Sequence, residues 1–384
     1  MAEGNQMQLD YHLPTRIVFG VGTLERLGEL CRPLGRRALL VTMPEVPHGQ
    51  RAAEMLEGAG IEAIVFDEAE ANPRASSADA AGELARETGC EFVVGLGGGS
   101  AMDAAKAAAV AATNAGPIWE YTIEYRGEQR AVREPPLPIV AIPTTAGTGS
   151  EVNGIAVLSN EQTRQKGPMR SPAIAPRIAL IDPALTTTLP AQTTASTGFD
   201  AFTHAFERYL GGEAHPFIDL LAEDAMRTVV TYLPRALARP DDLAARSRMS
   251  WAATQAAMCV VAPLGEAGLH IFGLPISAVL DAPHGETLAA MLPAVLTDLA
   301  EAHPDKCARL AQILGGEARP EACVGAAGRW LASIGMRMTL RGLGATEEHC
   351  RRLADSVNMD RLASSYCKRL TREDVQEMYR AALE

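Results

Sequence analysis

The chain has 384 residues, a length that one hydrophobic core rarely serves, so we expect two domains with a ligand-binding cleft between them. Its 47% hydrophobic and 21% charged residues are those of an ordinary globular protein. No apolar stretch reaches the roughly eighteen residues of a membrane span. A net charge of -12 without any basic run argues against a nucleic-acid surface and favours small-molecule chemistry.

The N-terminal stretch and the cysteines indicate the cellular compartment in which we expect the protein. The N-terminal stretch MAEGNQMQLDYHLP lacks the basic start and apolar run of a signal peptide. The seven cysteines, at positions 31, 90, 259, 307, 323, 350 and 367, show no paired spacing. Because structural disulfides persist in oxidising compartments, this pattern favours a reducing cytoplasm.

Short apolar runs alternate with helical stretches in the first half of the chain, as an open and mostly parallel α/β sheet requires. Each run is rich in Val, Ile or Leu, and the gaps between runs are long enough for crossover helices. The predicted strands are Arg37–Thr42, Ile61–Phe66, Glu91–Gly95, Pro138–Ile142 and Ile178–Ile181. We also expect a helix capped by Ser76 or Ser77 that ends near Gly89, and another over Ala104–Ala112.

After Asp182-Pro183 the sequence changes to long Ala- and Leu-rich segments with few β-branched clusters. The pairs Asp241-Asp242 and Gly315-Gly316 have the character of helix–helix connections, and Thr371 is a suitable N-cap for the last helix. We therefore expect an α/β domain over residues 1–184 and an all-helical domain over residues 185–384.

A glycine-rich loop, GLGGGS at residues 95–100, follows a predicted strand and opens a predicted helix. Successive glycines let the backbone approach a pyrophosphate closely, and the helix dipole favours negative charge at this end. A plain tight turn is the alternative. The order strand, loop, helix favours a phosphate site.

A second loop, PTTAGTGSE at residues 143–151, again follows a predicted strand. Four hydroxyl side chains lie within the seven positions from Thr144 to Ser150, more than an ordinary polar turn needs. We expect the two loops to face one dinucleotide.

Four residues have the spacing and chemistry of metal ligands. Asp200 and His204 are four positions apart, which places both side chains on one face of a helix. Downstream, His270 and His284 are fourteen positions apart. Three nitrogens and one carboxylate oxygen suit Fe(II), Zn(II) or a similar divalent ion with a position left for substrate.

The segment between the two downstream histidines indicates how they could meet. Gly273 and Pro275 are expected to interrupt one helix, and Pro283 is well placed to start the next, so two helix ends would present imidazoles to the same point. An isolated histidine is more often a surface or core residue than a ligand, and we assign that ordinary role to His12, His48, His215, His303 and His349.

Several long motifs resemble those of the iron-containing, group III alcohol dehydrogenases, whose wider relatives include glycerol dehydrogenase and dehydroquinate synthase. The motifs are PTTAGTGSE, LIDPALTTTLP, ASTGFDAFTHAFERYL and PHG. The resemblance spans nearly the whole chain, from LPTRIVFGVGTLERL through GLGGGSAMDAAK to IGMRMTLRGLGATEEH. It implies an α/β N-terminal dinucleotide-binding domain plus an all-α C-terminal metal-binding domain, with the cofactor in the cleft between them.

The resemblance also implies individual roles. The metal, Fe(II) with Zn(II) as the alternative, would be bound by Asp200, His204, His270 and His284, and the pyrophosphate of NAD or NADP by Gly97, Gly98, Gly99 and Ser100. The nicotinamide side would be lined by Asp103, Thr144, Thr145, Thr148 and Lys166, with Asn72 near the adenosine part. A homodimer or larger homo-oligomer is expected on the same ground.

The sequence departs from the family pattern at three positions. Met43 stands where many members place an acidic residue that contacts the ribose, so the preference for NAD or NADP is open at this cofactor position. Leu274 replaces a histidine of many members, which excludes a proton relay there. Leu288 stands where the family often has an asparagine, and together with Glu286-Thr287 and Met43-Pro44-Glu45 it resembles the sequence of maleylacetate reductases. Those relatives, however, lack the aspartate and histidine pair of GFDAFTH.

The resemblance implies a metal-dependent alcohol dehydrogenase or aldehyde reductase that moves a hydride between NAD(P)(H) and a small alcohol or aldehyde, including one with an acidic group. The metal would act as a Lewis acid on the substrate oxygen. We expect Asn153, Met258 and Phe272 to shape the substrate pocket.

Three alternatives remain. The first is a metal-independent reductase of the maleylacetate type. The second is a non-redox lyase of the dehydroquinate synthase kind, whose basic pocket would depend here on Lys166 and Arg170. The third is a non-catalytic nucleotide-binding protein, which would have no use for four metal ligands.

Overall fold

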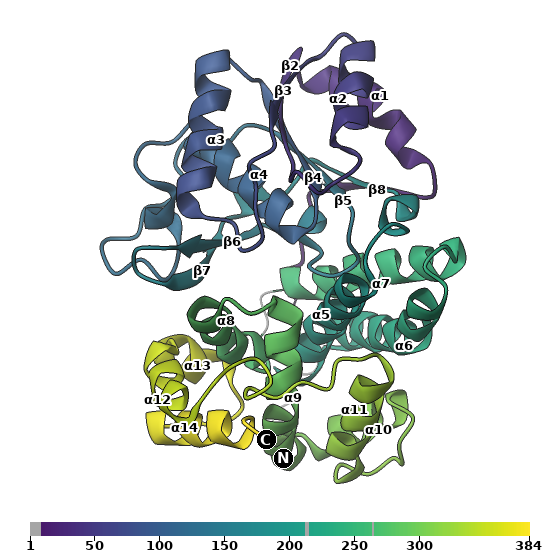
Figure 1. Ribbon diagram of the computed structural model, residues 1–384, viewed down its shortest axis with the longest axis vertical. Helices are drawn as coiled ribbons and strands as arrows, with labels where there is room; N and C mark the ends of the chain where they lie inside the picture. Colours follow the sequence, from purple (N-terminus) through teal and green to yellow (C-terminus); the bar gives the residue numbers. More distant parts are fainter. Residues whose placement is uncertain (1–8, 212–214, 263–264) are drawn as a thin grey trace.

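The computed structural model describes residues 9–211, 215–262 and 265–384, so the first eight residues of the N-terminal stretch lie outside it. A sheet of six parallel strands, in the order β1-β8-β5-β4-β2-β3, forms the upper half of the molecule in Figure 1. The strands are β1 (Arg16–Phe19), β2 (Arg37–Val41), β3 (Glu62–Phe66), β4 (Phe92–Gly97), β5 (Ile139–Pro143) and β8 (Ile178–Ile181). The five strands predicted from the apolar runs are confirmed to within two residues.

Helices cover both faces of this sheet, which is why its strands are apolar on both sides. Leu39 and Val41 of β2 pack into the cluster that contains α3 (Ala75–Thr88) and α4 (Gly99–Ala111). Their neighbours Ala38 and Leu40 pack on the other face, against α1 (Leu27–Cys31) and α2 (Gly49–Gly58). The prediction of an open parallel α/β sheet is confirmed.

A separate antiparallel hairpin, not predicted from the sequence, joins β6 (Ile155–Asn160) to β7 (Gln165–Arg170). It lies at the side of the α/β part, where β6 contacts α4 and β7 contacts helix α8 of the lower half (Figure 1). Short 3₁₀ turns complete this part: η1 (Thr23–Arg26), η2 (Arg32–Leu34), η3 (Ile118–Tyr121), η4 (Ser150–Val152), η5 (Pro172–Ile174) and η6 (Pro183–Thr186).

From residue 191 on, the regular elements of the described chain are helices, packed around one large apolar cluster. They are α5 (Ala191–Leu210), α6 (Pro216–Ala238), α7 (Leu243–Val261), α8 (Leu269–Leu280), α9 (His284–Ala302), α10 (Pro304–Ile313), α11 (Ala322–Ser333), α12 (Glu347–Ser356), α13 (Met359–Ser365) and α14 (Arg372–Ala381). The predicted connections at 241–242 and 315–316 lie between helices, and the Thr371 hydroxyl caps α14 by accepting from the Asp374 amide. None of the described helices has the length and apolar character to cross a membrane.

Two local predictions were wrong. Helix α8 continues through Gly273 and Pro275 instead of breaking there. Proline removes one backbone donor, the one that would bond Ile271 O, but the helix stays continuous where it packs against α9 and β7. Helix α3 starts at Ala75, so Ser76 and Ser77 lie inside its first turn and do not cap it.

Candidate active site

Helix α5 presents a polar stripe to the interior of the molecule. Asp200, His204 and Glu207 are spaced by four and three positions, so all three side chains lie on one face. Asp200 and Glu207 are buried at 3% and 4% exposure. Buried carboxylates are costly unless they are paired or bind a cation, so this stripe requires partners from elsewhere.

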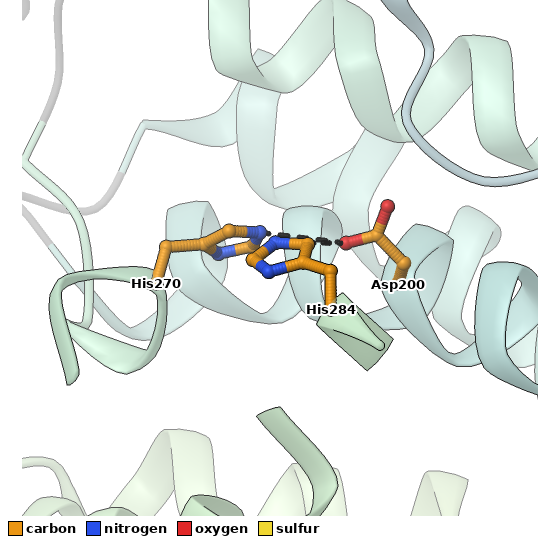
Figure 2. A group of neighbouring side chains, drawn as sticks. All are labelled: Asp200, His270 and His284. Carbon is orange, nitrogen blue, oxygen red and sulfur yellow. Dashed lines mark ion pairs between the residues drawn. The ribbon is translucent and has the colours of Figure 1, made fainter. Parts of the chain in front are cut away.

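The partners come from the N-terminal ends of two other helices. His270 is in the first turn of α8 and His284 is the first residue of α9, with Pro283 at its N-cap. The nearest ring nitrogens of His270 and His284 lie 3.4 Å and 3.9 Å from Asp200 Oδ1, and His204 Nδ1 lies 3.9 Å from the same oxygen. Figure 2 shows the imidazoles of His270 and His284 directed toward the Asp200 carboxylate.

The polar atoms at this point fit a metal ion. Asp200, His270 and His284 offer three ligand atoms within 4.8 Å of one another. His204 is just outside that group, with its ring stacked on His270 at 4.7 Å. The facing atoms Asp200 Oδ1, His204 Nδ1 and His270 Nε2 are buried and have no hydrogen-bond partner in the described part of the chain, and His284 faces Asp200 with its Nε2. Unpaired buried polar atoms are rare, and a carboxylate with three imidazoles is a donor set for a divalent transition metal.

At three of the four residues the electrostatics favour the protonation states that a metal needs. Burial lowers the pKa of His204, and it lowers the pKa of His284 to about 3, so these imidazoles are neutral at neutral pH. Burial alone would raise the pKa of Asp200, but His204, His270 and His284 together hold it well below its usual range. Glu207 and Asp200 outweigh burial at His270 and raise its pKa to about 10, so this imidazole must release a proton when a metal binds. Neutral imidazoles and an ionised carboxylate are the forms that bind metals.

Glu207 was missed in the sequence analysis. Its Oε2 lies 2.6 Å from His270 Nδ1, and its Oε1 accepts the His270 backbone N–H at 2.9 Å. The carboxylate therefore fixes the Nδ1–H tautomer and turns His270 Nε2 toward Asp200. Burial would raise the pKa of Glu207, but His270 lowers it overall. The signal available in the sequence was the seven-position spacing from Asp200.

The two predicted loops lie side by side at the carboxyl ends of neighbouring strands. Gly97 pairs in register with Pro143, and the Thr144 amide donates to Gly97 O at 2.8 Å. Gly98 is the N-cap of α4 and carries no capping side chain. A Cβ at Gly99 would lie 2.4 Å from Thr148 Cγ2, so glycine is required for the loops to touch.

Helix α4 also carries two buried charged residues, Asp103 and Lys106, which form a hydrogen-bond network. The resemblance to the family implied a role for Asp103 only. The Asp103 carboxylate accepts from Ser150 Oγ at 2.5 Å and from the Val157 amide at 2.8 Å. Lys106 Nζ donates to Ser150 Oγ at 2.7 Å and to Ile155 O at 2.7 Å. These bonds attach the second loop and strand β6 to the helix that starts at the glycine loop.

Lys166 and Asn72 connect the two halves of the molecule. Lys166 Nζ, on β7, donates to Asn72 Oδ1 at 2.7 Å and to Ser277 Oγ of α8 at 3.4 Å. Asn72 Nδ2 donates to Asp281 Oδ1 at 3.1 Å, just after α8. Burial lowers the pKa of Lys166 to about 8 against the attraction of nearby carboxylates. Asn72 thus lies near the metal ligands, and its predicted contact with adenosine stays a prediction.

One cavity of about 180 Å³ joins most of these groups. Its wall includes the four metal-ligand candidates and six of the predicted cofactor residues, Asn72, Gly99, Ser100, Asp103, Thr148 and Lys166. Gly97, Gly98, Thr144 and Thr145 belong to the adjoining loops, and Met43 follows β2, the neighbour of β4 in the sheet. Leu274 and Asn153 line the cavity, but Met258 and Phe272 do not; Phe272 packs in the helical core against Tyr366 and Tyr379.

Comparison with known families agrees with this geometry over both halves. A family profile described as "Iron-containing alcohol dehydrogenase" matches residues 14–183. A second, "Fe-containing alcohol dehydrogenase family, C-terminal", matches residues 194–383. The chain belongs to the iron-containing alcohol dehydrogenase family.

Characterised family members are similar over their full length. The 1,3-propanediol dehydrogenase of Citrobacter freundii is 34% identical over 97% of this chain and 98% of its own. Among solved structures, the NADH-dependent butanol dehydrogenase A of Thermotoga maritima superposes with a TM-score of 0.91 at 31% identity, covering 98% of this chain and 99% of its own. The sulfoacetaldehyde reductase of Bifidobacterium kashiwanohense, solved in complex with NAD+, gives 0.87 at 31% identity with the same coverage.

Family membership confirms several predictions. The chain is an oxidoreductase of the alcohol dehydrogenase family, which acts on CH–OH groups. The family uses NAD(H) and iron, so the predicted combination of a nicotinamide cofactor and a divalent metal is confirmed. The α/β domain followed by an all-helical domain is confirmed as well. These findings favour a dehydrogenase over a non-redox lyase or a non-catalytic nucleotide-binding protein.

Proposed function

We propose that this chain is a metal-dependent alcohol dehydrogenase and aldehyde reductase that transfers a hydride between NAD(P)(H) and a small alcohol or aldehyde. The supporting observation is that Asp200, His204, His270 and His284 converge, with unpartnered buried atoms on the first three, in the same cavity as the end of the glycine loop. A cavity of about 180 Å³ is smaller than the roughly 300 Å³ at the lower end of drug-sized sites, so a short substrate fits it best.

Each part of the site has a task in this reaction. The backbone amides of Gly97–Ser100 at the start of α4 bind the pyrophosphate, and Thr144, Thr145 and Thr148 position the nicotinamide beside the metal ligands. The bound divalent metal supplies a Lewis acid for the substrate oxygen. Glu207 keeps His270 in the ligating tautomer. Leu274 on the cavity wall offers no proton, which agrees with the exclusion of a relay there.

The bridge between the two halves serves to exclude water. Lys166 and Asn72 connect β7 and the α/β part to α8 and Asp281 over the metal ligands. Closing a site strengthens the electrostatic interactions inside it and shields the hydride from solvent. We place the division between the two domains at residues 184 and 185, and we propose a cytoplasmic homodimer or larger homo-oligomer without nucleic-acid or membrane partners.

Replacement of His284 tests the proposal. His284→Ala removes one ligand of four, so we expect bound metal, measured by elemental analysis, to fall and alcohol oxidation with NAD+ or NADP+ to be abolished. His12→Ala is the matched control, because His12 is exposed and far in sequence from the site. A fully active variant without metal would contradict the proposal.

Chelation separates this proposal from a metal-independent reductase of the maleylacetate type. Dialysis against a strong chelator should remove activity, and adding back Fe(II) or Zn(II) should restore it. Activity that survives complete metal removal would favour the metal-independent alternative.

A further inference from the structure

Arg170 stands at the end of strand β7, on the wall of the cavity that contains the metal-ligand candidates. Part of its surface is exposed to solvent while protein surrounds the rest, and in the described part of the chain its guanidinium has no hydrogen-bond or ion-pair partner. The cavity wall includes two further guanidiniums, those of Arg208 and Arg361. Substrate in this cavity therefore meets a cationic region as well as the metal ligands.

The nearby carboxylates are already engaged. Arg361 pairs with Glu266 at 2.7 Å, and Glu207 is bound by His270 at 2.6 Å. Arg208 donates to the backbone oxygens of Gly265 and Val260. The cavity wall thus carries carboxylates as well as guanidiniums, but Glu266 pairs with Arg361 and Glu207 with His270, and neither pairs with Arg170 in the described part of the chain.

Desolvation and the neighbouring guanidiniums act on Arg170 in the same direction. Desolvation by the surrounding protein, together with the Arg361 and Arg208 guanidiniums, lowers the pKa of Arg170 to about 10, and Glu266 and Glu207 offset only part of this effect. Arg170 still carries its full charge at neutral pH. An anion placed beside it would relieve this repulsion and replace the water lost when the site closes.

We propose that Arg170 is a specificity-determining residue that binds a terminal oxyanion of the substrate, so that the preferred substrates are short aldehydes and alcohols bearing a carboxylate, sulfonate or phosphonate. A planar guanidinium offers two parallel N–H groups to two oxygens of such a group, a geometry that an ammonium lacks. The reacting carbonyl lies at the metal ligands and the oxyanion at Arg170. This inference rests on the proposed function, because it assigns the far end of the same substrate.

The oxyanion takes no part in the bond changes. In the reducing direction the hydride leaves C4 of NAD(P)H for the carbonyl carbon, a proton from solvent adds to the oxygen, and the products are the alcohol and NAD(P)+. Arg170 contributes binding and orientation, so its loss should act mainly through KM for anionic substrates.

The test compares charged and neutral aldehydes of similar length. The wild-type holoenzyme is assayed with succinate semialdehyde, sulfoacetaldehyde and phosphonoacetaldehyde against butyraldehyde and propionaldehyde, with both cofactors. We expect kcat/KM to be at least about tenfold higher for one or more of the anionic aldehydes, since one charged hydrogen-bonding contact contributes about tenfold or more. The three anions distinguish which oxyanion the site prefers.

Variants assign the preference to the residue. Arg170→Met should lower kcat/KM for anionic aldehydes by about 10- to 100-fold through KM and change kcat/KM for neutral aldehydes far less. Arg170→Lys should recover part of the lost kcat/KM, because lysine restores the positive charge but not the two parallel N–H groups of the guanidinium. Arg319→Met, which removes an exposed arginine outside this cavity, is the control and should change neither substrate class.

Inhibition by small anions is a second readout, which does not depend on turnover of an anionic substrate. Propionate and methanesulfonate should inhibit butyraldehyde reduction competitively with the aldehyde, and Arg170→Met or Arg170→Gln should weaken that inhibition. The inference is overturned if the wild type reduces neutral aldehydes as well as anionic ones, or if the variants affect both classes alike. A wild type that reduces no aldehyde with either cofactor would instead overturn the proposed function.

Discussion

Glu207→Gln removes one negative charge behind His270 while keeping the side-chain shape. In the wild type both carboxylate oxygens accept from His270, one from the ring Nδ1–H at 2.6 Å and one from the backbone N–H at 2.9 Å. An amide has a single acceptor oxygen, so its NH2 group must face one of the two N–H donors. The imidazole consequently loses either its orientation or its backbone anchor.

The size of the effect follows from these contacts. Carboxylates behind ligating histidines typically contribute about 10- to 100-fold in metal affinity, which is about 1.4 to 2.7 kcal/mol. The buried unpaired N–H costs about 1–3 kcal/mol in the metal-free protein. We therefore expect Glu207→Gln to weaken metal binding by about 10- to 100-fold and to lower the Tm of the metal-free protein by several degrees.

Metal affinity is measured by competition of the metal-free protein with a chromophoric chelator for Zn(II), and Tm by scanning calorimetry with and without metal. Glu223→Gln is the matched control. Its carboxylate also accepts several bonds, from Tyr209, Arg227 and Arg309, but it lies on α6 away from the ligand group. It should lower Tm without changing metal affinity.

Wild-type metal affinity in Glu207→Gln would show that the carboxylate does not orient His270 for binding. An equal loss of affinity in both variants would mean that general destabilisation, and not the local contact, causes the effect.

Two further predictions concern the dinucleotide loops and the buried lysine. Gly99→Ala places a methyl group 2.4 Å from Thr148 Cγ2 and separates the loops, so NADH fluorescence titration should show a Kd raised about tenfold or more. Gly328→Ala, with open space around it, is the control and should leave the Kd unchanged. Equal affinities of the two variants for NADH would contradict the close loop contact. Burial lowers the pKa of Lys106 from 10.5 to about 8, so between these two pH values the unfolded chain binds more protons than the folded one. The free energy of unfolding of the wild type should therefore rise with pH over this range, relative to that of Lys106→Met. The measurement is the free energy of chemical unfolding of the two metal-free proteins as a function of pH. Parallel profiles would show that burial does not lower the pKa of Lys106.

Local sequence patterns were enough for the sheet and the two loops. Apolar runs such as Ile178–Ile181 are buried on both faces, so they stand out as strands whatever surrounds them. The 95–100 glycine loop follows β4 and opens α4 because its glycines permit that sharp change of direction. Asp200 and His204 were placed on one face by helix periodicity alone.

Other elements carried no local signal. The β7 sequence QKGPMR contains glycine and proline and has the composition of a turn, yet it forms a strand because it pairs with β6 and packs against α8. Pro275 indicated a helix break, but α8 is continuous and packs against α9 and β7. In both cases packing outweighs local propensity.

The amino-acid sequence by itself determined which side chains could bind a metal and which loops could bind a dinucleotide, since residue type and spacing are local properties. Only the tertiary structure decided that α5, α8 and α9 bring Asp200, His270 and His284 to one point. It also decided that Glu207 lies behind His270 and that Arg170 faces the same cavity without a partner in the described chain. Such convergence depends on how separate helices and a hairpin pack, and contacts between residues tens of positions apart leave no mark on the spacing within any one segment.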